Sequence, residues 1–403
     1  MSEPLIVIGN GMAAARFVDE LGKRALGRYA IAVIGEEPRL AYNRVLLSAL
    51  LAEEIGFADI ELKPARWWRD RGVTVRYGVR ATAIDPTART VTLASGTQLS
   101  FSKLVLATGS QPIKLDLPGK DLPGVLTFRD VNDVDTIAAR KGARVVVIGG
   151  GLLGLEAAYG LAKAKAQVTV VHLMDRLMER QLDARAAGML KRAVEAKGIA
   201  VRLEAQTARI VGQSKVEGLE LRDGTIIAAD AVVVAVGIRP STELARAGGL
   251  KVNRGIVVDD QLETSTSGIH AIGECAEHRG LCYGLVEPAY EHAQILARRL
   301  AGENVTYAGS VLATNLKVSG VNVFSAGDFL GATAGAEEIV FSDPGFGLYK
   351  KLVIADDRLI GAVLFGDTAD GPWYLDLIRA GSSIERLRDD LVFGRDLATR
   401  VAA

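Results

Sequence analysis

With 403 residues, the chain is long enough for two or three domains with substantial cores. Its 48 basic and 48 acidic residues balance and form no long basic run, which argues against nucleic acid or a membrane surface as the main partner. Its apolar runs fall far short of the roughly 20 residues of a membrane span, and its first strand starts too early for a signal peptide, so we expect a cytoplasmic protein.

The cysteines and histidines offer no recognisable metal site or dithiol. Cys275 and Cys282 are the only two cysteines, and their spacing matches neither C-x-x-C nor C-x-x-x-x-C. The four histidines show no i,i+4 pair and no zinc-type spacing. The sequence therefore predicts neither a protein-bound metal nor a thiol relay.

The first element along the chain is an apolar strand at Leu5–Ile8 that runs into a glycine-rich turn. Gly9, Gly11 and Ala14 form the pattern G-x-G-x-x-A, and a helix from about Met12 to Ala25 follows. In this motif the first Gly makes a tight turn, and the second lets backbone approach a pyrophosphate. The third small residue lets the helix pack on the strand, so that the helix N-terminus points at the phosphates.

The next strand, Tyr29–Ile34, ends at two acidic residues. Glu36 stands where an acid can accept from the ribose hydroxyls of a bound adenosine, although Glu36 and Glu37 could also be solvated loop charges. The unit continues with short strands and closes on a final apolar strand: Val73–Tyr77, Ala81–Asp85, Thr90–Thr92 and Lys103–Gly109.

The same order of elements repeats 140 residues further along the chain. The strand Arg144–Ile148 leads into Gly149, Gly151 and Gly154, which form G-x-G-x-x-G, and the helix Leu152–Ala164 follows. A single such motif is weak evidence, because glycine-rich turns also serve packing alone. Two of them in the correct context predict two bound nucleotides.

The remaining elements complete the second unit and add a third. Leu106–Gly109 resembles Val234–Gly237, so one Rossmann-like design has been duplicated. The later segments that we expect are the amphipathic helix Leu182–Ala196, the helix Pro288–Leu300, the antiparallel strands Val321–Ser325, Ile339–Phe341, Leu348–Ile354 and Leu359–Phe365, and a helical portion from Tyr374 to the end. The predicted fold is α/β, with two Rossmann-like three-layer ββα dinucleotide-binding domains and a C-terminal α+β domain.

Four motifs in order give the chain a recognisable character over essentially its whole length. They are the G-x-G-x-x-A motif at Gly9–Ala14 (the first fingerprint), Ala107-Thr108-Gly109, the G-x-G-x-x-G motif at Gly149–Gly154 (the second fingerprint) with Glu156, and Ala271-Ile272-Gly273-Glu274. Together they resemble the two-dinucleotide flavoprotein family that contains glutathione reductase and the ferredoxin and rubredoxin reductases. Several stretches are closer still to the FAD-binding N-terminal module of the assimilatory NAD(P)H nitrite reductase large subunit: Glu36–Arg39, Ala41–Val45, Gly149–Ala158, Gly237–Pro240 and Ala271–Ala276.

The resemblance implies that the first fingerprint holds FAD and the second holds NAD(P)H. Residues 1–112 and 241–307 would form the FAD domain, residues 113–240 the NAD(P)H domain, and residues 308–403 an interface domain. Arg44 would lie near the pyrophosphate and the Val79 backbone near adenine, while Glu274 would hold the ribityl chain. Arg129 would also contact FAD, although both arginines could be plain surface charges. The predicted cofactor-binding residues are Gly9, Gly11, Ala13, Ala14, Glu36, Arg44, Val79, Ala107, Thr108, Gly109, Arg129, Gly149, Gly151, Leu152, Leu153, Gly154, Glu156, His172, Arg176, Gly237, Gly273, Glu274 and Val286.

One of these positions, Val286, is supported by physical chemistry without the resemblance. Val286-Glu287-Pro288 starts a helix with Pro in its first turn, and the free N–H groups there would suit the negative charge of a reduced flavin, unless this is an ordinary surface helix start. At the end of the second strand of the second unit, His172 stands where NAD-preferring relatives usually place Glu. His172 and Arg176 could donate to a 2′-phosphate, with Asp175 opposing them, although His172 could also simply cap the strand. We predict a weak preference for NADPH.

The sequence also departs from parts of the family. Ala49 stands where the ferredoxin-reductase branch usually has a Lys that pairs with the acid equivalent to Glu156. A reactive Cys in the same region, which marks the peroxidase and disulfide-reductase branches, is missing from the sequence. The iron–sulfur and sirohaem cysteines of full nitrite reductases are missing too, so we expect no nitrite reduction by this stretch alone.

The resulting hypothesis is an FAD-dependent NAD(P)H:acceptor oxidoreductase with no side-chain acid or base catalyst. Hydride passes from the nicotinamide to flavin N5, and electrons then reach a separate iron–sulfur or haem protein. We expect this acceptor to belong to nitrate or nitrite assimilation. The alternatives are an NAD(P)H oxidase that makes hydrogen peroxide, and a flavin-bound redox sensor with slow turnover. Trp373 and Tyr374 could form a homodimer face or could be core residues.

Overall fold

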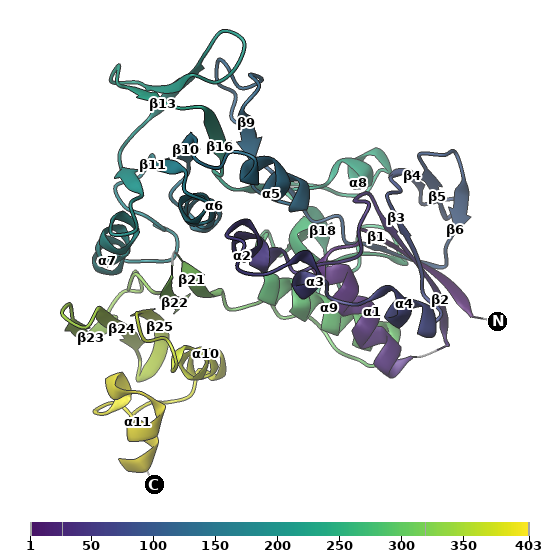
Figure 1. The fold of residues 1–403 in the computed structure, drawn as a ribbon. Coiled ribbons are helices and arrows are strands. Elements are labelled where there is room, and N and C mark those ends of the chain that lie inside the picture. The colour runs from purple at the N-terminus through teal and green to yellow at the C-terminus, as the bar shows by residue number, and fades with distance from the viewer. Residues whose placement is uncertain (1, 26, 319, 402–403) are drawn as a thin grey trace. The chain divides into compact units, whose positions relative to one another are not determined.

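The chain divides into two units, each built around its own parallel sheet. The structure is a computed structural model that describes residues 2–25, 27–318 and 320–401. Unit one comprises Met1–Leu47, Ile55–Gln111 and Ile238–Ser310. Unit two comprises Ser48–Glu54, Pro112–Gly237 and Val311–Ala403. Figure 1 traces both units along the chain, and the early segment of unit two, residues 48–54, interrupts unit one in sequence.

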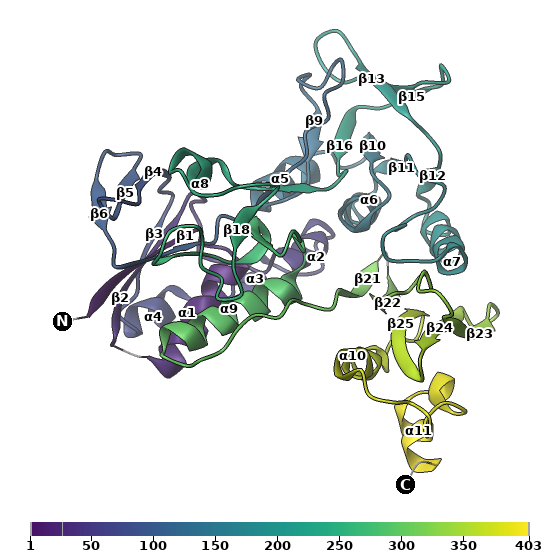
Figure 2. The same cartoon turned by 180° about the vertical axis from the view of Figure 1, so that it is seen from behind.

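The central sheet of unit one is parallel throughout and has the order β19-β7-β1-β2-β3. Its strands are β1 (Glu3–Ile8), β2 (Tyr29–Gly35), β3 (Thr74–Tyr77), β7 (Lys103–Leu106) and β19 (Ile269–Ala271). The apolar runs of β1 and β7 are buried, as expected for strands that are covered on both faces. Helices α1 (Met12–Arg24) and α9 (Val286–Leu300) lie side by side in both views (Figure 1 and Figure 2) and carry part of this core.

Smaller elements complete unit one. An antiparallel sheet and a parallel strand pair are formed by β4 (Ala81–Asp85), β5 (Thr90–Leu93) and β6 (Gln98–Ser100), and by β18 (Ile256–Val258) and β20 (Ala276–His278). The short helices are η1 (Arg44–Leu46), α3 (Phe57–Ile60), α4 (Ala65–Asp70), α8 (Glu243–Ala247) and η2 (Gly273–Cys275). The two strands β8 (Ser110–Pro112) and β17 (Ile238–Pro240) pair where the chain leaves and re-enters the unit.

Unit two repeats the parallel design in the order β12-β11-β10-β16-β9. Its strands are β9 (Val125–Thr127), β10 (Arg144–Ile148), β11 (Gln167–Val171), β12 (Ala200–Arg202) and β16 (Ala231–Val234). The helices are α5 (Val131–Ala138), α6 (Leu152–Lys163) and α7 (Ala184–Glu195), and β13 (Thr207–Val211), β14 (Gly218–Leu221) and β15 (Ile226–Ala228) form an antiparallel sheet. Both predicted Rossmann-like sheets are thus confirmed.

A short helix from early in the sequence packs within unit two. This is α2 (Leu47–Leu51), and a Cβ on Gly160 of α6 would come within 2.7 Å of the Leu51 side chain. Glu54 pairs with Lys163 at 3.5 Å, one turn further along α6. Gly160 is therefore required by the close approach of α2, which the sequence pattern alone did not reveal.

The C-terminal part of unit two is an antiparallel sheet in the order β21-β22-β25-β24-β23. Its strands are β21 (Ala313–Val318), β22 (Val321–Gly327), β23 (Glu337–Asp343), β24 (Leu348–Ala355) and β25 (Arg358–Phe365). The helices α10 (Gly371–Ala380), η3 (Leu391–Phe393) and α11 (Arg395–Val401) follow. The predicted α+β character of this region is confirmed.

The predicted helical portion from Tyr374 to the end is wrong in its continuity. Helix α10 ends at Ala380, because the next residue, Gly381, has a left-handed φ of +55° that stops the helix, and α11 is a separate segment. Tyr374 is fully buried and donates from its hydroxyl to the Leu391 carbonyl at 2.7 Å. Tyr374 is therefore a core residue, one of the two alternatives expected, and Trp373 is partly buried against the same core.

Within the part of the chain that the structure describes, no helix combines the length and the apolar character needed to cross a bilayer.

Candidate functional site

The first glycine loop, residues 9–14, lies where β1 turns into α1, and we call it the first cradle. Gly9 has φ +111°, and a Cβ there would collide with the carbonyl oxygen of Ala107. Glycine is therefore required by both the left-handed backbone and the close approach of the Ala107-Thr108 strand end. At Gly11, in contrast, an added Cβ would have no other described atom within 4 Å, so the backbone faces open space.

The second cradle repeats this geometry where β10 turns into α6. Gly149 has φ +122°, and a Cβ there would collide with the Ala235 carbonyl oxygen. Gly151 again faces open space, while a Cβ on Gly154 would collide with the Gly149 carbonyl oxygen. The third glycine is thus a packing requirement, and Leu152 and Leu153 form the first turn of the helix.

Both cradles leave the first N–H groups of a helix available to a ligand. Among the described residues, no side chain caps α1 at Gly11 or α6 at Gly151. The neighbouring helix α5 is capped by Asp130, which accepts from the Asp133 N–H at 2.9 Å, and α7 is capped in the same way by Asp183. Open space, free N–H groups and the positive helix end together fit the pyrophosphate of a dinucleotide.

The end of β2 separates the two neighbouring acids that the sequence left ambiguous. Glu36 is exposed, with its carboxylate 3.8 Å from Arg80. Glu37 accepts from the Tyr42 hydroxyl at 2.7 Å and pairs with Arg44, the predicted pyrophosphate contact. The ribose role therefore remains open to Glu36, whereas Glu37 has a structural role.

Two segments are tied to the end of β2 by contacts with its backbone: the one at Val79, the predicted adenine contact, and the one at Asn10, directly after Gly9. The predicted adenine residue Val79 donates from its N–H to the Gly35 carbonyl at 2.8 Å. A Cβ on Gly35 would come within 2.6 Å of Asn10, and the Asn10 amide donates to the Arg39 carbonyl at 3.2 Å. Asn10, which we did not select from sequence, thus ties the cradle to the end of β2.

Three motifs that are far apart in sequence meet beside the first cradle. The Thr108 hydroxyl donates to the Ser241 carbonyl at 2.7 Å, and Gly109 turns with φ +65°. The next residue, Ser110, donates to the Glu274 carboxylate at 2.7 Å. The predicted ribityl acid is therefore already oriented by a hydroxyl that the sequence reading missed, although Ser110 directly follows the Ala-Thr-Gly motif.

Gly273 and the start of α9 complete this region. Gly273 has φ +77°, and a Cβ there would come within 3.0 Å of the Ala13 Cβ on α1. Helix α9 begins at Val286, and no side chain of the described residues caps it at Leu285. The predicted helix start is thus confirmed, and the positive end of the α9 dipole would suit the electron-rich edge of a reduced flavin.

Two predicted residues of unit two have well-defined surroundings. Glu156 is buried on α6, and burial raises the pKa of its carboxyl to about 8. A carboxyl with this pKa is mostly protonated at neutral pH. Arg129 precedes α5, and its N–H donates to Asp133 at 2.7 Å, which fixes the backbone of this loop.

His172 is more constrained than the sequence suggested. Its Nδ1 accepts from the Gly150 N–H at 3.0 Å, so the ring proton lies on Nε2, which donates to Glu179 at 3.1 Å. A Cβ on Gly150 would come within 2.7 Å of the imidazole. His172 therefore supports the glycine loop through its hydrogen bond with Gly150, and both of its ring nitrogens have protein partners.

Arg176 is the second predicted phosphate ligand, and it lies in the same loop. Its guanidinium pairs with Asp175 at 3.0 and 3.2 Å. The opposing acid that we anticipated is thus in direct contact with the arginine, and a 2′-phosphate would have to compete with it.

At the other end of the second unit, Gly237 turns with φ +117° directly after Val236.

Neither cysteine has the surroundings of a reactive thiol. Cys275 is fully buried, and burial raises the pKa of its thiol. Cys282 is partly buried, and burial together with Glu277 raises its thiol pKa as well. Both thiols are therefore protonated at neutral pH and poor nucleophiles.

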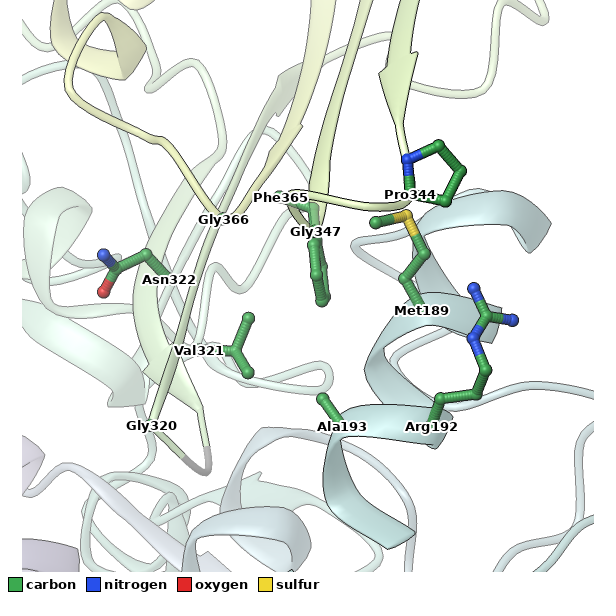
Figure 3. A pocket seen from close by; sticks show the side chains of 10 residues that line it. All are labelled: Met189, Arg192, Ala193, Gly320, Val321, Asn322, Pro344, Gly347, Phe365 and Gly366. Carbon is green, nitrogen blue, oxygen red and sulfur yellow. The ribbon is translucent and has the colours of Figure 1, made fainter. Parts of the chain in front are cut away.

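A separate cavity of about 380 Å³ lies in unit two between α7 and the C-terminal sheet. Figure 3 shows Phe365 pointing into it, with Met189 and Arg192 of α7 on one side and Val321 of β22 on the other. None of the predicted cofactor-binding residues lines this cavity. The candidate site therefore consists of the open glycine loops and not of this hollow.

The fold and the two cradles define an oxidoreductase built to bind two dinucleotides. Residues 3–298 match the family described as pyridine nucleotide-disulphide oxidoreductase, and residues 313–382 match the rubredoxin NAD+ reductase C-terminal domain. The chain belongs to the pyridine nucleotide-disulphide oxidoreductase family. Membership identifies it as an oxidoreductase with FAD and NAD(P)H as its cofactors.

Individual relatives agree with this assignment. The chain is 45% identical over 383 residues to a nitrite reductase [NAD(P)H] of Bacillus subtilis, covering 94% of this chain and 48% of the relative. It is 40% identical to the assimilatory nitrate reductase electron transfer subunit of the same organism, covering 98% and 50%. A ferredoxin reductase structure from Rhodopseudomonas palustris is 27% identical over 100% of both chains, with a TM-score of 0.88. The chain spans about half the length of the curated relatives it matches.

Proposed function

We propose that this chain is an NAD(P)H:acceptor reductase that delivers electrons to a separate iron–sulfur or haem protein. The observation that carries the proposal is the pair of cradles, in which Gly11 and Gly151 both face open space at the start of an uncapped helix. Two such cradles fit two dinucleotides, one that is retained and one that exchanges. We place this activity in the cytoplasm.

The residues of unit one would bind and orient FAD. The α1 N-terminus would hold the pyrophosphate, and the exposed Glu36 carboxylate would accept from the adenosine ribose. Glu274, oriented by Ser110, would accept from a ribityl hydroxyl. When bound, FAD supplies the capacity to accept a hydride and to release electrons to an acceptor.

The residues of unit two would bind the nicotinamide dinucleotide. The α6 N-terminus would hold its pyrophosphate, and His172 would support the glycine loop through its hydrogen bond with Gly150. With a pKa of about 8, the Glu156 carboxyl would be neutral beside the nicotinamide, and it needs no cationic partner such as the Lys that Ala49 replaces. The α9 N-terminus would stabilise the negative charge that reduction places on the flavin.

The nature of the acceptor is inferred from the relatives. Nitrite reductases and a nitrate reductase electron transfer subunit suggest an acceptor in nitrate or nitrite assimilation. A reductase of ferredoxin with the same fold supports a small iron–sulfur protein as a possible acceptor class. No thiol relay is needed, because both cysteines have raised thiol pKa values.

The test is a comparison of acceptors with purified protein. The protein should be yellow, and heat or acid should release intact FAD into the supernatant, because no residue of the sequence marks a covalent flavin attachment. NAD(P)H oxidation should be fast with ferricyanide and slow with oxygen alone. Rapid peroxide formation with oxygen would favour an oxidase, and tight nicotinamide binding without turnover would favour a sensor. A pull-down from nitrate-grown cells would then identify the acceptor.

A further inference from the structure

A buried histidine on α9 is bonded to the loop that carries the proposed ribityl acid. His292 is 1% exposed, and its Nδ1 accepts from the Gly273 backbone N–H at 3.2 Å. Gly273 directly precedes Glu274 in sequence. The same helix therefore presents its N-terminus near the proposed flavin position and fixes the neighbouring loop through a side chain.

The imidazole is held in one orientation and one tautomer. Because Nδ1 accepts from an N–H, the ring proton is on Nε2. The ring packs edge-on against Tyr307, with centroids 4.5 Å apart, and against Tyr283 at 5.9 Å. Burial lowers the pKa of His292 to about 3, so the ring stays neutral over the working pH range and remains an acceptor.

The Gly273 backbone has little freedom of its own. Its φ is +77°, and a Cβ would come within 3.0 Å of Ala13 on α1 and 3.8 Å of Ala289 on α9. The loop thus threads between two packed helices, where water cannot readily replace a lost partner of the N–H. Removal of the imidazole acceptor would leave this buried N–H unpaired and let the peptide rotate.

We propose that His292 is a positioning residue for FAD, which fixes the Gly273 peptide and thereby holds the Glu274 carboxylate in register with Ser110. This proposal rests on the FAD site proposed above. It assigns to α9 a second task, distinct from the helix N-terminus at Val286. His292 itself touches Gly273 and two tyrosine rings, and it acts on the cofactor through Glu274.

The test compares two replacements that separate hydrogen bonding from packing. In His292→Asn, Oδ1 takes the place of Nδ1 and keeps the acceptor, but part of the ring volume is lost. In His292→Leu, a methyl group takes that place, so the volume is better filled but the acceptor is gone. FAD dissociation constants are measured by titrating each full-length apoprotein with FAD, together with the thermal unfolding midpoint of each apoprotein.

We expect His292→Leu to bind FAD about tenfold more weakly than wild type, equivalent to ~1.4 kcal/mol, and His292→Asn to stay within about threefold. His270→Leu is the matched control, because His270 is also a buried histidine and no hydrogen bond within the described part of the chain joins its ring to Gly273. It should bind FAD as wild type does.

The outcomes separate this proposal from the FAD site itself. If FAD affinity follows the apoprotein unfolding midpoint, with His292→Asn weaker than His292→Leu, His292 serves packing only and the proposal is wrong. Equal affinity of His292→Leu and wild type would also overturn it. A wild-type protein that binds no FAD would instead refute the function proposed for unit one, whatever the variants do.

Discussion

The two cradles share a backbone but differ in the side chains around it. Gly9 and Gly149 are both left-handed and both abut a carbonyl oxygen, from Ala107 in one unit and Ala235 in the other. The shared geometry shows that the glycines are set by backbone contacts. The differences nearby must then decide which nucleotide each cradle holds.

The first difference lies five residues after the second glycine of each motif. Unit one has Arg16, whose guanidinium pairs with Glu20 at 3.1 Å and lies over the Tyr290 ring. Unit two has Glu156, which is buried with a raised pKa. One helix carries a paired, partly exposed charge at this position and the other carries a mostly protonated acid, so the two helices differ in charge at the same distance from their glycine loops.

The second difference lies at the end of the second strand. Unit one has the exposed Glu36 after β2, while unit two has the buried His172 after β11, hydrogen-bonded to Gly150 and Glu179. An exposed carboxylate can read a ribose, whereas an engaged imidazole mainly supports the loop. We therefore propose that nucleotide choice in unit two depends on Arg176 and Asp175 more than on His172.

The largest expected effect separates the two cradles by filling the space at each second glycine. Gly11→Val should abolish FAD retention, because its side chain would occupy the pyrophosphate position. Gly151→Val should retain FAD but raise KM for NAD(P)H by more than about tenfold, a loss of at least ~1.4 kcal/mol. Flavin content and steady-state kinetics with ferricyanide measure both. Loss of FAD in Gly151→Val, or its retention in Gly11→Val, would reverse the assignment of the cradles.

The next effect concerns the buried acid of unit two. The pKa of Glu156 is about 8 in the folded protein and 4.5 in the unfolded chain, so between these pH values the folded state keeps a proton that the unfolded state releases. Stability should therefore fall as pH rises, by up to ~1.4 kcal/mol per pH unit from this group. Glu156→Gln should flatten this slope in urea unfolding measured between about pH 5 and pH 8, roughly the interval between the two pKa values. An unchanged slope would show that Glu156 is ionised in the fold.

A smaller effect tests the loop that follows β11. Asp175→Asn should free the Arg176 guanidinium and raise kcat/KM for NADPH relative to NADH by about fivefold, ~1 kcal/mol. Arg176→Ala should shift the same ratio the other way. Initial rates with both nucleotides measure the ratio, and His172→Gln serves as the comparison at the adjacent support residue. No change in either variant would place the adenosine end elsewhere.

The smallest effect is expected at the cysteines. The double variant Cys275→Ala, Cys282→Ser should keep most NAD(P)H oxidation, because both thiols have raised pKa values and Cys275 only donates weakly to the Leu106 and Ile272 carbonyls. A fall in turnover beyond about tenfold at unchanged flavin content, or ~1.4 kcal/mol in the barrier, would revive a thiol mechanism.

The sequence predicted the cradles well, because they depend on local rules. A left-handed turn needs glycine, and an apolar strand before a helix sets its direction, so Gly9, Gly149 and the starts of α1 and α6 followed from pattern alone. The helix start at Val286 followed from the placement of Pro288.

The missed features depend on residues that meet only after folding. The Ser110–Glu274 hydrogen bond, the Gly273 contact of His292 and the Gly160 contact of Leu51 join distant segments, and no local spacing predicts them. The hydrogen bond between Gly150 and His172 was missed in the same way, because Gly150 lies at the end of another strand. The break after α10 had a local signal in Gly381 that the prediction ignored.

The central claim is that NAD(P)H bound in the second cradle gives its electrons to an FAD bound in the first cradle. The direct measurement mixes FAD-loaded protein with NADPH or NADH under anaerobic conditions and follows the absorbance of oxidised flavin. We predict rapid loss of that absorbance in the wild type, recovery on adding ferricyanide, and much slower loss in Gly151→Val at equal flavin content. Oxidised flavin that persists in the wild type with either nucleotide would contradict the account.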